Sequence, residues 1–286
     1  LSILFSVSKE IATIIHDDCL VIIESTSYPK TTADFIKPIL DERGTKYYLA
    51  FSPERVDPSN STYNVKNTPK VVGGVDTNSS DLAAKVYSNS LGVPVSVVSK
   101  PEVAEFTKIL ENSYRLVNIS LINELARIAE RLEVDIWEVI EAAKTKPFGF
   151  MPFYPGVGIG GHCIPVDPLY LYVSKKYDLN TTLINRAIEI NDEQPYYIIG
   201  RILDIMLEHT ISKCEPILIL GAAYKGDIDD CRESPALKVM KLLEEKDISY
   251  DLYDPYVKEI EILGKRKVSC NIEDVYSDLE AGYYKL

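Results

Sequence analysis

The stretch PEVAEFTKILENSYRLVNISLINELARIAERL, from Pro101 to Leu132, decides the fold. Its apolar residues recur every three or four positions, which is the spacing of one face of an α-helix. Ser99 and Glu102 have the spacing of a capping box at the start of that helix. A helix of about 30 residues is long enough to bridge two domains. The apolar stripe of this helix consists of Phe106, Ile109, Leu110, Val117, Leu121, Leu125, Ile128 and Leu132.

On both sides of this helix, short apolar runs alternate with helical segments, which is typical of parallel α/β sheets. Before it, we expect strands at 19–24, 46–51, 71–75 and 93–98, and helices at 31–43 and around 81–87. After it, we expect helices at 136–144, from 168, at 182–209 and from 235, and strands at 216–220 and 248–253. The sequence therefore predicts an α/β domain at 1–98, a helical middle domain at 99–209 and a second α/β domain at 210–286.

The composition argues against several classes of protein. The 286 residues include 43 acidic and 31 basic side chains, and the resulting formal net charge of -12 disfavours nucleic acid and anionic membranes as partners. No apolar run approaches the roughly 20 residues of a membrane span. Five scattered cysteines and three histidines form no metal-ligand or disulfide pattern. We therefore expect a protein of the reducing cytoplasm that has no metal site.

The segment YPGVGIGGHCIPVDPLYL, from Tyr154 to Leu171, carries the candidate chemistry. Its glycines and prolines predict irregular structure as far as Pro168, where a helix can begin. Cys163 is then expected in a loop just before a helix N-terminus, where backbone N–H groups and the helix dipole lower a thiol pKa and favour the nucleophilic thiolate. Taken alone, Cys163 is equally well interpreted as a buried structural cysteine. The other four cysteines lack this setting.

Three glycines of the same segment, Gly156, Gly158 and Gly161, formally match the fingerprint of a dinucleotide-binding loop. They follow PFGFMPFYP rather than a β-branched strand, and the acidic residue that should end a second strand about 20 residues later is missing. We therefore interpret this loop as one whose N–H groups line a sugar or phosphate site.

Other polar residues lie near the predicted edges of these elements. Glu54 and Arg55 follow the strand at 46–51, where α/β proteins place functional side chains, although a surface ion pair explains them as well. Lys225 and Arg232 lie in the loop after the strand at 216–220, a natural site for phosphate. Four polar residues share one face of the long helix, which is either functional or simply solvated: Lys108, Asn112, Arg115 and Asn123.

In order along the chain, these motifs resemble the UDP-glucose/GDP-mannose dehydrogenase family. The resemblance extends from about Leu20 to Tyr253 and is carried by six motifs. They are ESTSYPKTT at 24–32, FSPERVDP at 51–58, KVVGG at 70–74, the helix at 104–130, GVGIGGHCIPVDPLYL at 156–171 and GAAYKGDIDDCRESPA at 221–236.

The resemblance implies two doubly wound, Rossmann-like domains joined by a helical middle domain, through which a homodimer forms. The family also begins with a strand and a GxGxxG loop that cradles the pyrophosphate of a dinucleotide. Neither precedes Cys19. We therefore expect an incomplete N-terminal domain, and a chain that binds NAD weakly but still binds a UDP-sugar.

The activity implied by the resemblance is a four-electron oxidation of a UDP-sugar at C6 by two NAD, through a thiohemiacetal and a thioester on Cys163. Lys108 and Asp167 are expected to flank the thiol, where they stabilise oxyanions and position water. Glu54 is expected to act as the acid/base partner in hydrolysis, and Asn112 to hold the substrate oxygen or the water. Residues expected to contact the UDP-sugar are Arg55, Tyr154, Gly156, Gly158, Gly160, Gly161 and Lys225, and those expected near NAD are Thr26 and Arg232.

Two segments restrict the class of UDP-sugar that we expect as the substrate. KPFGFMPFYPG and GGHCIPVDP resemble enzymes that act on UDP-N-acetylglucosamine and UDP-N-acetylmannosamine. Members that act on UDP-glucose usually carry a lysine directly before the aspartate, where this chain has Val166. The alternatives are a UDP-glucose 6-dehydrogenase, a non-catalytic UDP-sugar-binding or oligomerisation fragment, and a cysteine hydrolase. The hydrolase needs a base beside Cys163, and the adjacent His162 is poorly placed because neighbouring side chains diverge.

Overall fold

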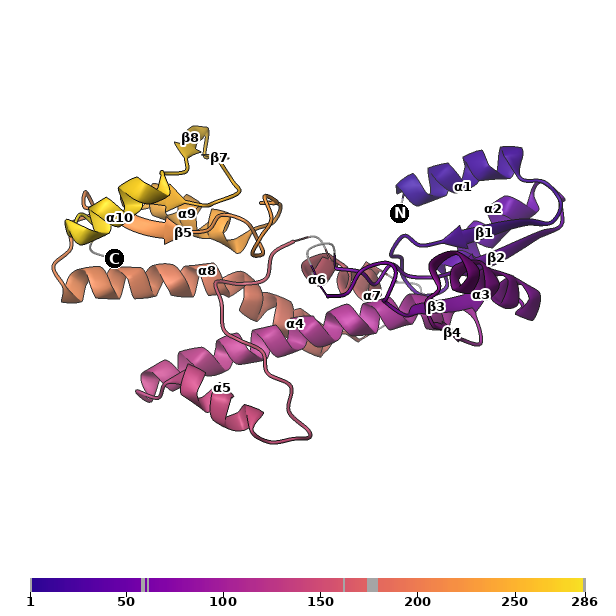
Figure 1. Ribbon diagram of the computed structural model, residues 1–286, viewed down its shortest axis with the longest axis horizontal. Coiled ribbons are helices and arrows are strands. Elements are labelled where there is room, and N and C mark those ends of the chain that lie inside the picture. The colour runs from indigo at the N-terminus through magenta and orange to yellow at the C-terminus, as the bar shows by residue number, and fades with distance from the viewer. Residues whose placement is uncertain (1, 58–59, 61, 162, 174–179, 285–286) are drawn as a thin grey trace. The chain divides into compact units, whose positions relative to one another are not determined.

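The computed structural model describes residues 2–57, 60, 62–161, 163–173 and 180–284, without the side chains of Cys163, Tyr172 and Val173. The chain forms two compact units, whose elements are labelled in Figure 1. Unit 1 comprises 1–113 and 166–181, and unit 2 comprises 114–165 and 182–286. Among the helices in the described ranges, none is long and apolar enough to cross a membrane.

Unit 1 is built on a four-stranded sheet with the order β1-β2-β3-β4. Its strands are β1 (Cys19–Ile23), β2 (Tyr47–Phe51), β3 (Lys70–Gly74) and β4 (Val95–Val97). Because successive side chains of a strand point to opposite faces, Leu49 and Phe51 enter one core and Ala50 enters another. Helices α1 (Ser2–Ile14) and α2 (Lys37–Asp41) contribute to the first core, and α3 (Thr77–Leu91) contributes to the second. Because both faces of the sheet are buried, the sequences of its strands are largely continuous apolar runs.

The sheet of unit 1 is mixed, so the expectation of a parallel sheet was wrong at one pairing. β1 and β2 are parallel, as are β3 and β4, but β2 and β3 pair antiparallel with Phe51 opposite Gly73. A parallel connection needs a crossover, usually a helix, whereas a chain that reverses direction pairs antiparallel. The described residues between β2 and β3 contain no helix to carry such a crossover.

The helix expected at 31–43 is divided into two elements. Residues Thr32–Ile36 form a π-helical turn, η1, and α2 follows directly. Pro38 explains the division, because it has no N–H to donate and its ring crowds the carbonyl of the preceding turn. The segment ends near Gly44, whose φ of 71° lies in the left-handed region that glycine adopts readily.

The long helix is present as α4 (Pro101–Arg131), with 31 residues. Its buried face carries polar as well as apolar residues, among them Glu105, Asn112, Leu116, Ser120 and Asn123. Most of the predicted apolar stripe is instead exposed, namely Phe106, Leu110, Leu121, Leu125, Ile128 and Leu132. Periodicity therefore located this helix correctly, but the interpretation of Asn112 and Asn123 as part of a solvated face was wrong.

Unit 2 combines helices with a second, smaller α/β region. Its helices include α5 (Ile136–Lys144), α8 (Thr182–Glu208), α9 (Pro235–Glu245) and α10 (Ile272–Glu280), and its strands are β5 (Ile217–Leu220), β6 (Tyr250–Tyr253), β7 (Glu259–Ile262) and β8 (Lys265–Val268). β5 and β6 pair parallel, with α9 between them in sequence. Figure 1 shows α8 alongside α9, and the two helices share a buried core with β5 and β6. The antiparallel β7–β8 hairpin and α10 were not predicted, although Glu259–Ile262 alternates charged and apolar residues as a half-buried strand does.

The segment around Cys163 differs from the expectation. A helical turn, α6 (Cys163–Val166), begins at the cysteine itself, and a second short helix, α7 (Leu169–Val173), follows. Cys163 therefore begins a helical turn and does not lie in a loop that continues to Pro168. A single turn has only a small dipole, so the expected effect of a helix dipole on the thiol loses most of its basis.

Candidate active site

Glu54 lies in the loop after β2, within a cluster of charged and hydroxyl groups of unit 1. The buried ammonium of Lys70, on β3, lies 2.9 Å from the Glu54 carboxylate and 3.5 Å from that of Glu24, which follows β1. Tyr87, on α3, donates a hydrogen bond of 2.7 Å to Glu24, and the Lys70 ammonium lies 5.3 Å from the centre of its ring. Two carboxylates thus share one buried cation.

The ionisation of Glu54 follows from these contacts. Partial burial works to raise the pKa of this carboxyl, but the backbone N–H of Val56 and the Lys70 ammonium outweigh it, so the pKa is lowered. Glu54 is therefore a carboxylate at neutral pH. That state fits a base or a water-positioning group better than an acid.

Arg55 has different partners from its neighbour Glu54. Its Nε and Nη2 atoms donate to the Glu111 carboxylate on α4, at 3.0 and 2.6 Å, and its Nη1 atom donates to the carbonyl of Pro69. The alternative of a Glu54–Arg55 surface pair was therefore wrong. Arg55 holds the loop after β2 against α4 and the start of β3, so its contacts within unit 1 are structural.

Asn112 and Asp167 are brought together in unit 1. The Nδ2 atom of Asn112 on α4 donates a hydrogen bond of 2.5 Å to the Asp167 carboxylate, and both residues are buried. Lys108 lies one helical turn before Asn112 on α4 and is partly buried. Burial and the Asp167 carboxylate raise the pKa of Tyr170 on α7. This pair is the part of the predicted catalytic set that the described residues place in contact.

The glycine-rich loop, residues 156–161, precedes Cys163 in unit 2. Its apolar residue Ile159 is buried with Ile164, which follows the cysteine, against Leu116 on α4 and Ala187 on α8. The backbone on both sides of Cys163 is therefore anchored in one core. The Cys163 side chain itself lies outside the described residues, so its proximity to Lys108 and Asp167 stays a prediction.

Three glycines of the loop are required by geometry. Gly158 has a φ of 131° and Gly161 a φ of 77°, conformations that side chains disfavour. A Cβ added at Gly160 would lie 2.6 Å from the Cβ of Tyr224 and 2.8 Å from the carbonyl oxygen of Glu233. The loop thus packs its bare backbone onto the segment between β5 and α9. Gly156, by contrast, has open space where a Cβ would be.

Tyr154 lies on the surface of unit 2, next to α5. Its ring stacks on Trp137 at 5.8 Å, and its hydroxyl donates to Glu141 at 3.1 Å. Lys144 also lies within hydrogen-bond distance of this hydroxyl, at 3.3 Å. These contacts fix Tyr154 with half of its surface exposed. A role in substrate binding remains a prediction for this residue.

Lys225 and Arg232 lie in the loop between β5 and α9, as predicted. Arg232 is largely exposed and pairs with Asp230 at 2.7 Å. The start of the loop is held by the buried Asp254 carboxylate, which accepts hydrogen bonds from the backbone N–H groups of Ala222 and Ala223. Burial works to raise the pKa of Asp254, but its four backbone donors outweigh that effect and lower it. Asp254 was not identified from the sequence.

Thr26 lies in the loop after β1 and is partly buried. The neighbouring Ser27 is completely buried, and its hydroxyl has no hydrogen-bond partner among the described residues. The rest of the loop is held by the buried Glu105 on α4, which accepts hydrogen bonds from the N–H groups of Lys30 and Thr32 and from the Thr32 hydroxyl. Burial raises the pKa of Glu105 against these donors.

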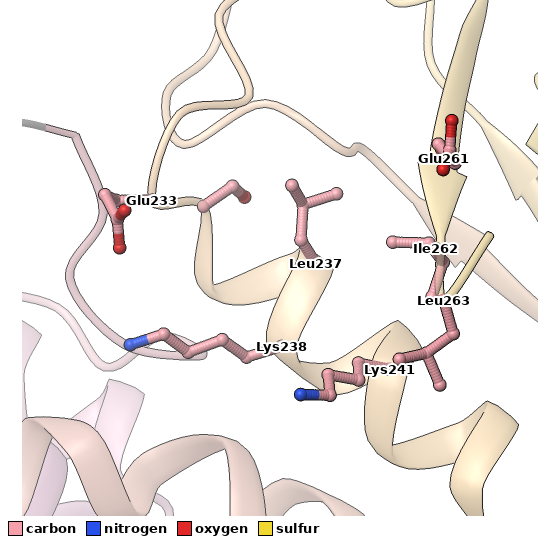
Figure 2. Close-up of a pocket in the computed structure, with 8 residues that line it drawn as sticks. Glu233, Leu237, Lys238, Lys241, Glu261, Ile262 and Leu263 are labelled. Carbon is pink, nitrogen blue, oxygen red and sulfur yellow. The ribbon is translucent and has the colours of Figure 1, made fainter.

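A groove of about 290 Å³ in unit 2 lies between α9 and β7. None of the residues assigned from the sequence lines it. Figure 2 shows that the side chains of Lys238 and Lys241 extend the same way from α9, apart from the Glu261 carboxylate on β7. These charged groups do not gather at one point, so this groove is not a candidate active site.

Three domains of one protein family match this chain. Residues 1–91 match the NAD binding domain, residues 102–193 the central domain and residues 218–281 the UDP binding domain of the UDP-glucose/GDP-mannose dehydrogenase family. The chain belongs to this family. Its fold is accordingly α/β, with Rossmann-like regions on either side of a helical middle.

Three individual members of the family are similar to this chain over most of its length. A UDP-N-acetyl-D-mannosamine dehydrogenase of Methanococcus aeolicus is 35% identical over 257 residues, which are 90% of this chain and 57% of that protein. A UDP-N-acetyl-D-glucosamine 6-dehydrogenase of Pseudomonas aeruginosa is 32% identical over 89% of this chain and 61% of its own. The solved UDP-D-ManNAc dehydrogenase of Pyrococcus horikoshii matches with a TM-score of 0.82 and 35% identity, covering 90% of this chain and 62% of its own. The chain thus spans a little over half the length of these family members.

Sequence reasoning missed several residues of the candidate site. Lys70 is the first residue of β3 and belongs to the motif KVVGG, but no role was predicted for its side chain. Asn191 and Gln194, which contact the glycine-rich loop, lie in the run INDEQP on α8. Their spacing of three residues was a usable signal, because it places two amides on one face of the helix.

Proposed function

We propose that the protein carrying this chain is an NAD-dependent UDP-N-acetylhexosamine 6-dehydrogenase. The observation that carries the proposal is the glycine-rich loop at 156–161, which leads directly into Cys163 and is packed without side chains against the β5–α9 segment. A loop of that kind can present N–H groups to a sugar nucleotide, and the cysteine that follows can form a covalent bond with it. UDP-N-acetylmannosamine and UDP-N-acetylglucosamine are the proposed substrates, since the named family members act on these two.

The chemistry assigns each residue a distinct role. C6 of the sugar loses a hydride and its hydroxyl loses a proton to water, which gives an aldehyde. The Cys163 thiolate adds to that aldehyde to form the oxyanion of a thiohemiacetal, and loss of a second hydride from it gives a thioester. Water then hydrolyses the thioester, which releases the carboxylate and regenerates the thiolate. NAD, when bound, is the hydride acceptor in both oxidations. Lys108 stabilises the oxyanions and Asp167, held by Asn112, accepts a proton through water. Glu54 is ionised and can orient the hydrolytic water.

The residues toward NAD in unit 1 fit part of a dinucleotide site. Thr26 and Ser27 lie in the loop at the carboxyl end of β1, which is where ligands bind in α/β sheets. The buried Ser27 hydroxyl, which lacks a hydrogen-bond partner among the described residues, can complete such a site. Arg232 is the proposed contact from the loop before α9. Thr26 and Ser27 would hold one side of the cofactor.

The proposal includes a division into an NAD-binding part at 1–98, a middle domain at 99–209 and a UDP-sugar-binding part at 210–286. It also includes a cytoplasmic location and a role in supplying uronic acids for polysaccharide biosynthesis. The acidic composition and the absence of a disulfide pattern support the location.

A homodimer formed through α4 is part of the same proposal. The exposed apolar residues Leu121, Leu125 and Ile128 share one side of α4 in unit 2, and the exposed Leu132 follows directly after the helix. A contiguous exposed apolar stripe of this kind is typical of a protein–protein interface. A dimer in light scattering at micromolar concentration, converted to a monomer by Leu125→Glu, is the expected result, and a wild-type monomer contradicts the proposal.

The activity is tested by following NADH formation with the protein and each of UDP-N-acetylmannosamine, UDP-N-acetylglucosamine and UDP-glucose. We expect two NADH for each molecule of one N-acetylhexosamine substrate, and little reaction with UDP-glucose. UDP-sugar binding without NADH formation contradicts the catalytic proposal and favours a binding fragment. NADH formation from UDP-glucose alone contradicts the proposed substrate class.

A further inference from the structure

A loop made largely of glycine can be held in place only through its backbone. The glycine-rich loop has few side chains, so its N–H and C=O groups must find partners elsewhere. Three buried amide side chains supply them within unit 2. They are Asn123 on α4 and Asn191 and Gln194 on α8, each no more than 5% exposed.

Each amide makes a specific bond with the loop. The N–H of Gly156 donates to Oδ1 of Asn123 at 2.9 Å, and the N–H of Ile159 donates to Oδ1 of Asn191 at 2.5 Å. The Nε2 atom of Gln194 donates to the carbonyl of Gly156 at 2.9 Å. The loop is therefore fixed at both its first residue and its middle.

The orientation of these amides is determined by their partners. Arg127 on α4 donates from Nε and Nη2 to Oε1 of Gln194, at 2.9 and 2.7 Å, and this forces Nε2 of Gln194 toward the loop. An N–H of the loop can bond only to an oxygen, so Oδ1 of Asn123 and of Asn191 must face it. Arg127 is held in turn by the carbonyl of Ile190 and by the ring of Tyr197.

Burial of the Asn123 amide has an energetic cost. The Nδ2 atom of Asn123 is buried and has no hydrogen-bond partner among the described residues. An unsatisfied buried donor is destabilising, and such groups are uncommon in native proteins. The benefit visible in the structure is the bond from Oδ1 of Asn123 to Gly156.

We propose that Asn123, Asn191 and Gln194, braced by Arg127, form an amide clamp that positions the glycine-rich loop for the sugar nucleotide. These are positioning residues, because they act through the loop. The inference rests on the proposed function, which supplies the ligand of the loop. It predicts that weakening the clamp lowers affinity for the UDP-sugar without altering affinity for NAD.

Two variants and one control test the clamp. Gln194→Glu keeps the shape of the side chain and its bond to Arg127, but replaces the donor to Gly156 by an acceptor. Asn191→Ala removes the acceptor for Ile159. Ser120→Ala is the matched control, because the buried Ser120 hydroxyl donates to the Ala187 carbonyl at 2.7 Å between the same two helices without touching the loop.

Three measurements are made on the protein and its variants: hydrogen exchange of the loop amides, calorimetric binding of both UDP-N-acetylhexosamines, and KM for NAD. In Gln194→Glu the carboxylate repels the Gly156 carbonyl, so we expect the bond of the Gly156 N–H to Asn123 to weaken and its exchange to become about tenfold faster or more. We expect the same at Ile159 in Asn191→Ala, and in both variants a similar loss of UDP-sugar affinity. We expect unchanged KM for NAD, and in Ser120→Ala only a lower Tm.

Two results overturn the clamp. One is unchanged loop exchange in both variants, and the other is faster exchange with unchanged UDP-sugar affinity. If Asn191→Ala does not fold, the isosteric Gln194→Glu carries the test alone. A wild-type protein that binds neither UDP-sugar contradicts the proposed function instead, and the exchange data still report whether the amides hold the loop.

Discussion

Around Glu54 in unit 1 the fixing side chains are charged, whereas around the glycine-rich loop in unit 2 they are neutral amides. Lys70 joins two partly exposed carboxylates, Glu54 and Glu24, and its own side chain is buried. The side chains of Asn191 and Gln194 are buried, and they bind backbone groups of Ile159 and Gly156. The charged cluster therefore determines the ionisation state of Glu54, and the buried amides determine the position of the glycine-rich loop.

The two regions should therefore respond differently to pH and to substitutions. A charged cluster loses its interaction when a carboxylate is protonated, so its contribution depends on pH. Amides do not titrate, so the loop keeps its position across the pH range but depends on the shape of every contacting group. Variants near Glu54 should therefore alter pH profiles, and variants near the loop should alter substrate affinity.

The largest effect is expected from Cys163→Ser, at the end of the loop. Loss of the nucleophile should lower the rate of acid formation by several orders of magnitude, while UDP-sugar binding persists because the loop is intact. Product formation and calorimetry measure the two properties. Cys214→Ser is the control, because Cys214 is an exposed free cysteine of the same unit and should not affect either. Full turnover by Cys163→Ser excludes the covalent mechanism.

The next effect sharpens the claim that the loop depends on shape. Gly160→Ala places a Cβ 2.6 Å from the Cβ of Tyr224 and against the Glu233 carbonyl, so the loop or its support must move. We expect UDP-sugar affinity to fall by about 10- to 100-fold, the equivalent of the roughly 1–3 kcal/mol that overpacking costs. Gly200→Ala on α8 is the control from the same unit, because its Cβ meets open space and the residue has no assigned contact with the UDP-sugar. Equal effects of the two substitutions contradict this account.

The third prediction concerns the ionisation of Glu54 in unit 1. Lys70→Met keeps much of the side-chain volume but removes the cation that lowers the pKa of Glu54. The pKa of Glu54 should rise, so the acidic limb of the pH–rate profile should move to higher pH. A carboxyl with a lowered pKa stabilises the fold above its usual pKa, and that stabilisation is lost as pH falls through the folded-state value. In Lys70→Met the acid-dependent loss of stability should therefore be smaller.

Measured pH profiles and acid denaturation of Lys70→Met test the third prediction. Lys37→Met is the control, because Lys37 pairs with Asp41 on the exposed side of α2, away from Glu54. An acidic limb that stays in place in Lys70→Met shows that Glu54 is not the group that titrates.

The sequence predicted most elements of this fold because their periodicity is local. The bounds of α4, α5 and α8 follow from apolar spacing within each helix. The direction of β3 relative to β2 does not, because pairing depends on the path of the connecting residues. The exposed stripe of α4 could not be recognised either, since spacing identifies an apolar face but not what covers it.

The residues of the candidate site were also predictable from the sequence only in part. Residues that carry chemistry, such as Cys163 and Asp167, belong to sequence motifs that can be recognised. The residues that position them, Lys70 and Gln194, are ordinary polar residues until folding buries them beside a partner. Their roles come from contacts between segments far apart in sequence, which no local pattern encodes.

The smallest effect is expected from Arg232→Gln, which tests whether a charged residue in unit 2 behaves like those in unit 1. The Arg232 side chain is 78% exposed and pairs with the nearby Asp230, so its removal should leave Tm and UDP-sugar affinity unchanged. Its proposed contact is NAD, so KM for NAD should rise. Arg266→Gln is the control, because Arg266 forms an exposed pair with Glu259 on the β7–β8 hairpin and should alter none of the three quantities. If Arg232→Gln weakens UDP-sugar binding and leaves KM for NAD unchanged, Arg232 belongs to the substrate site, and the loop before α9 contributes charge as well as shape to unit 2.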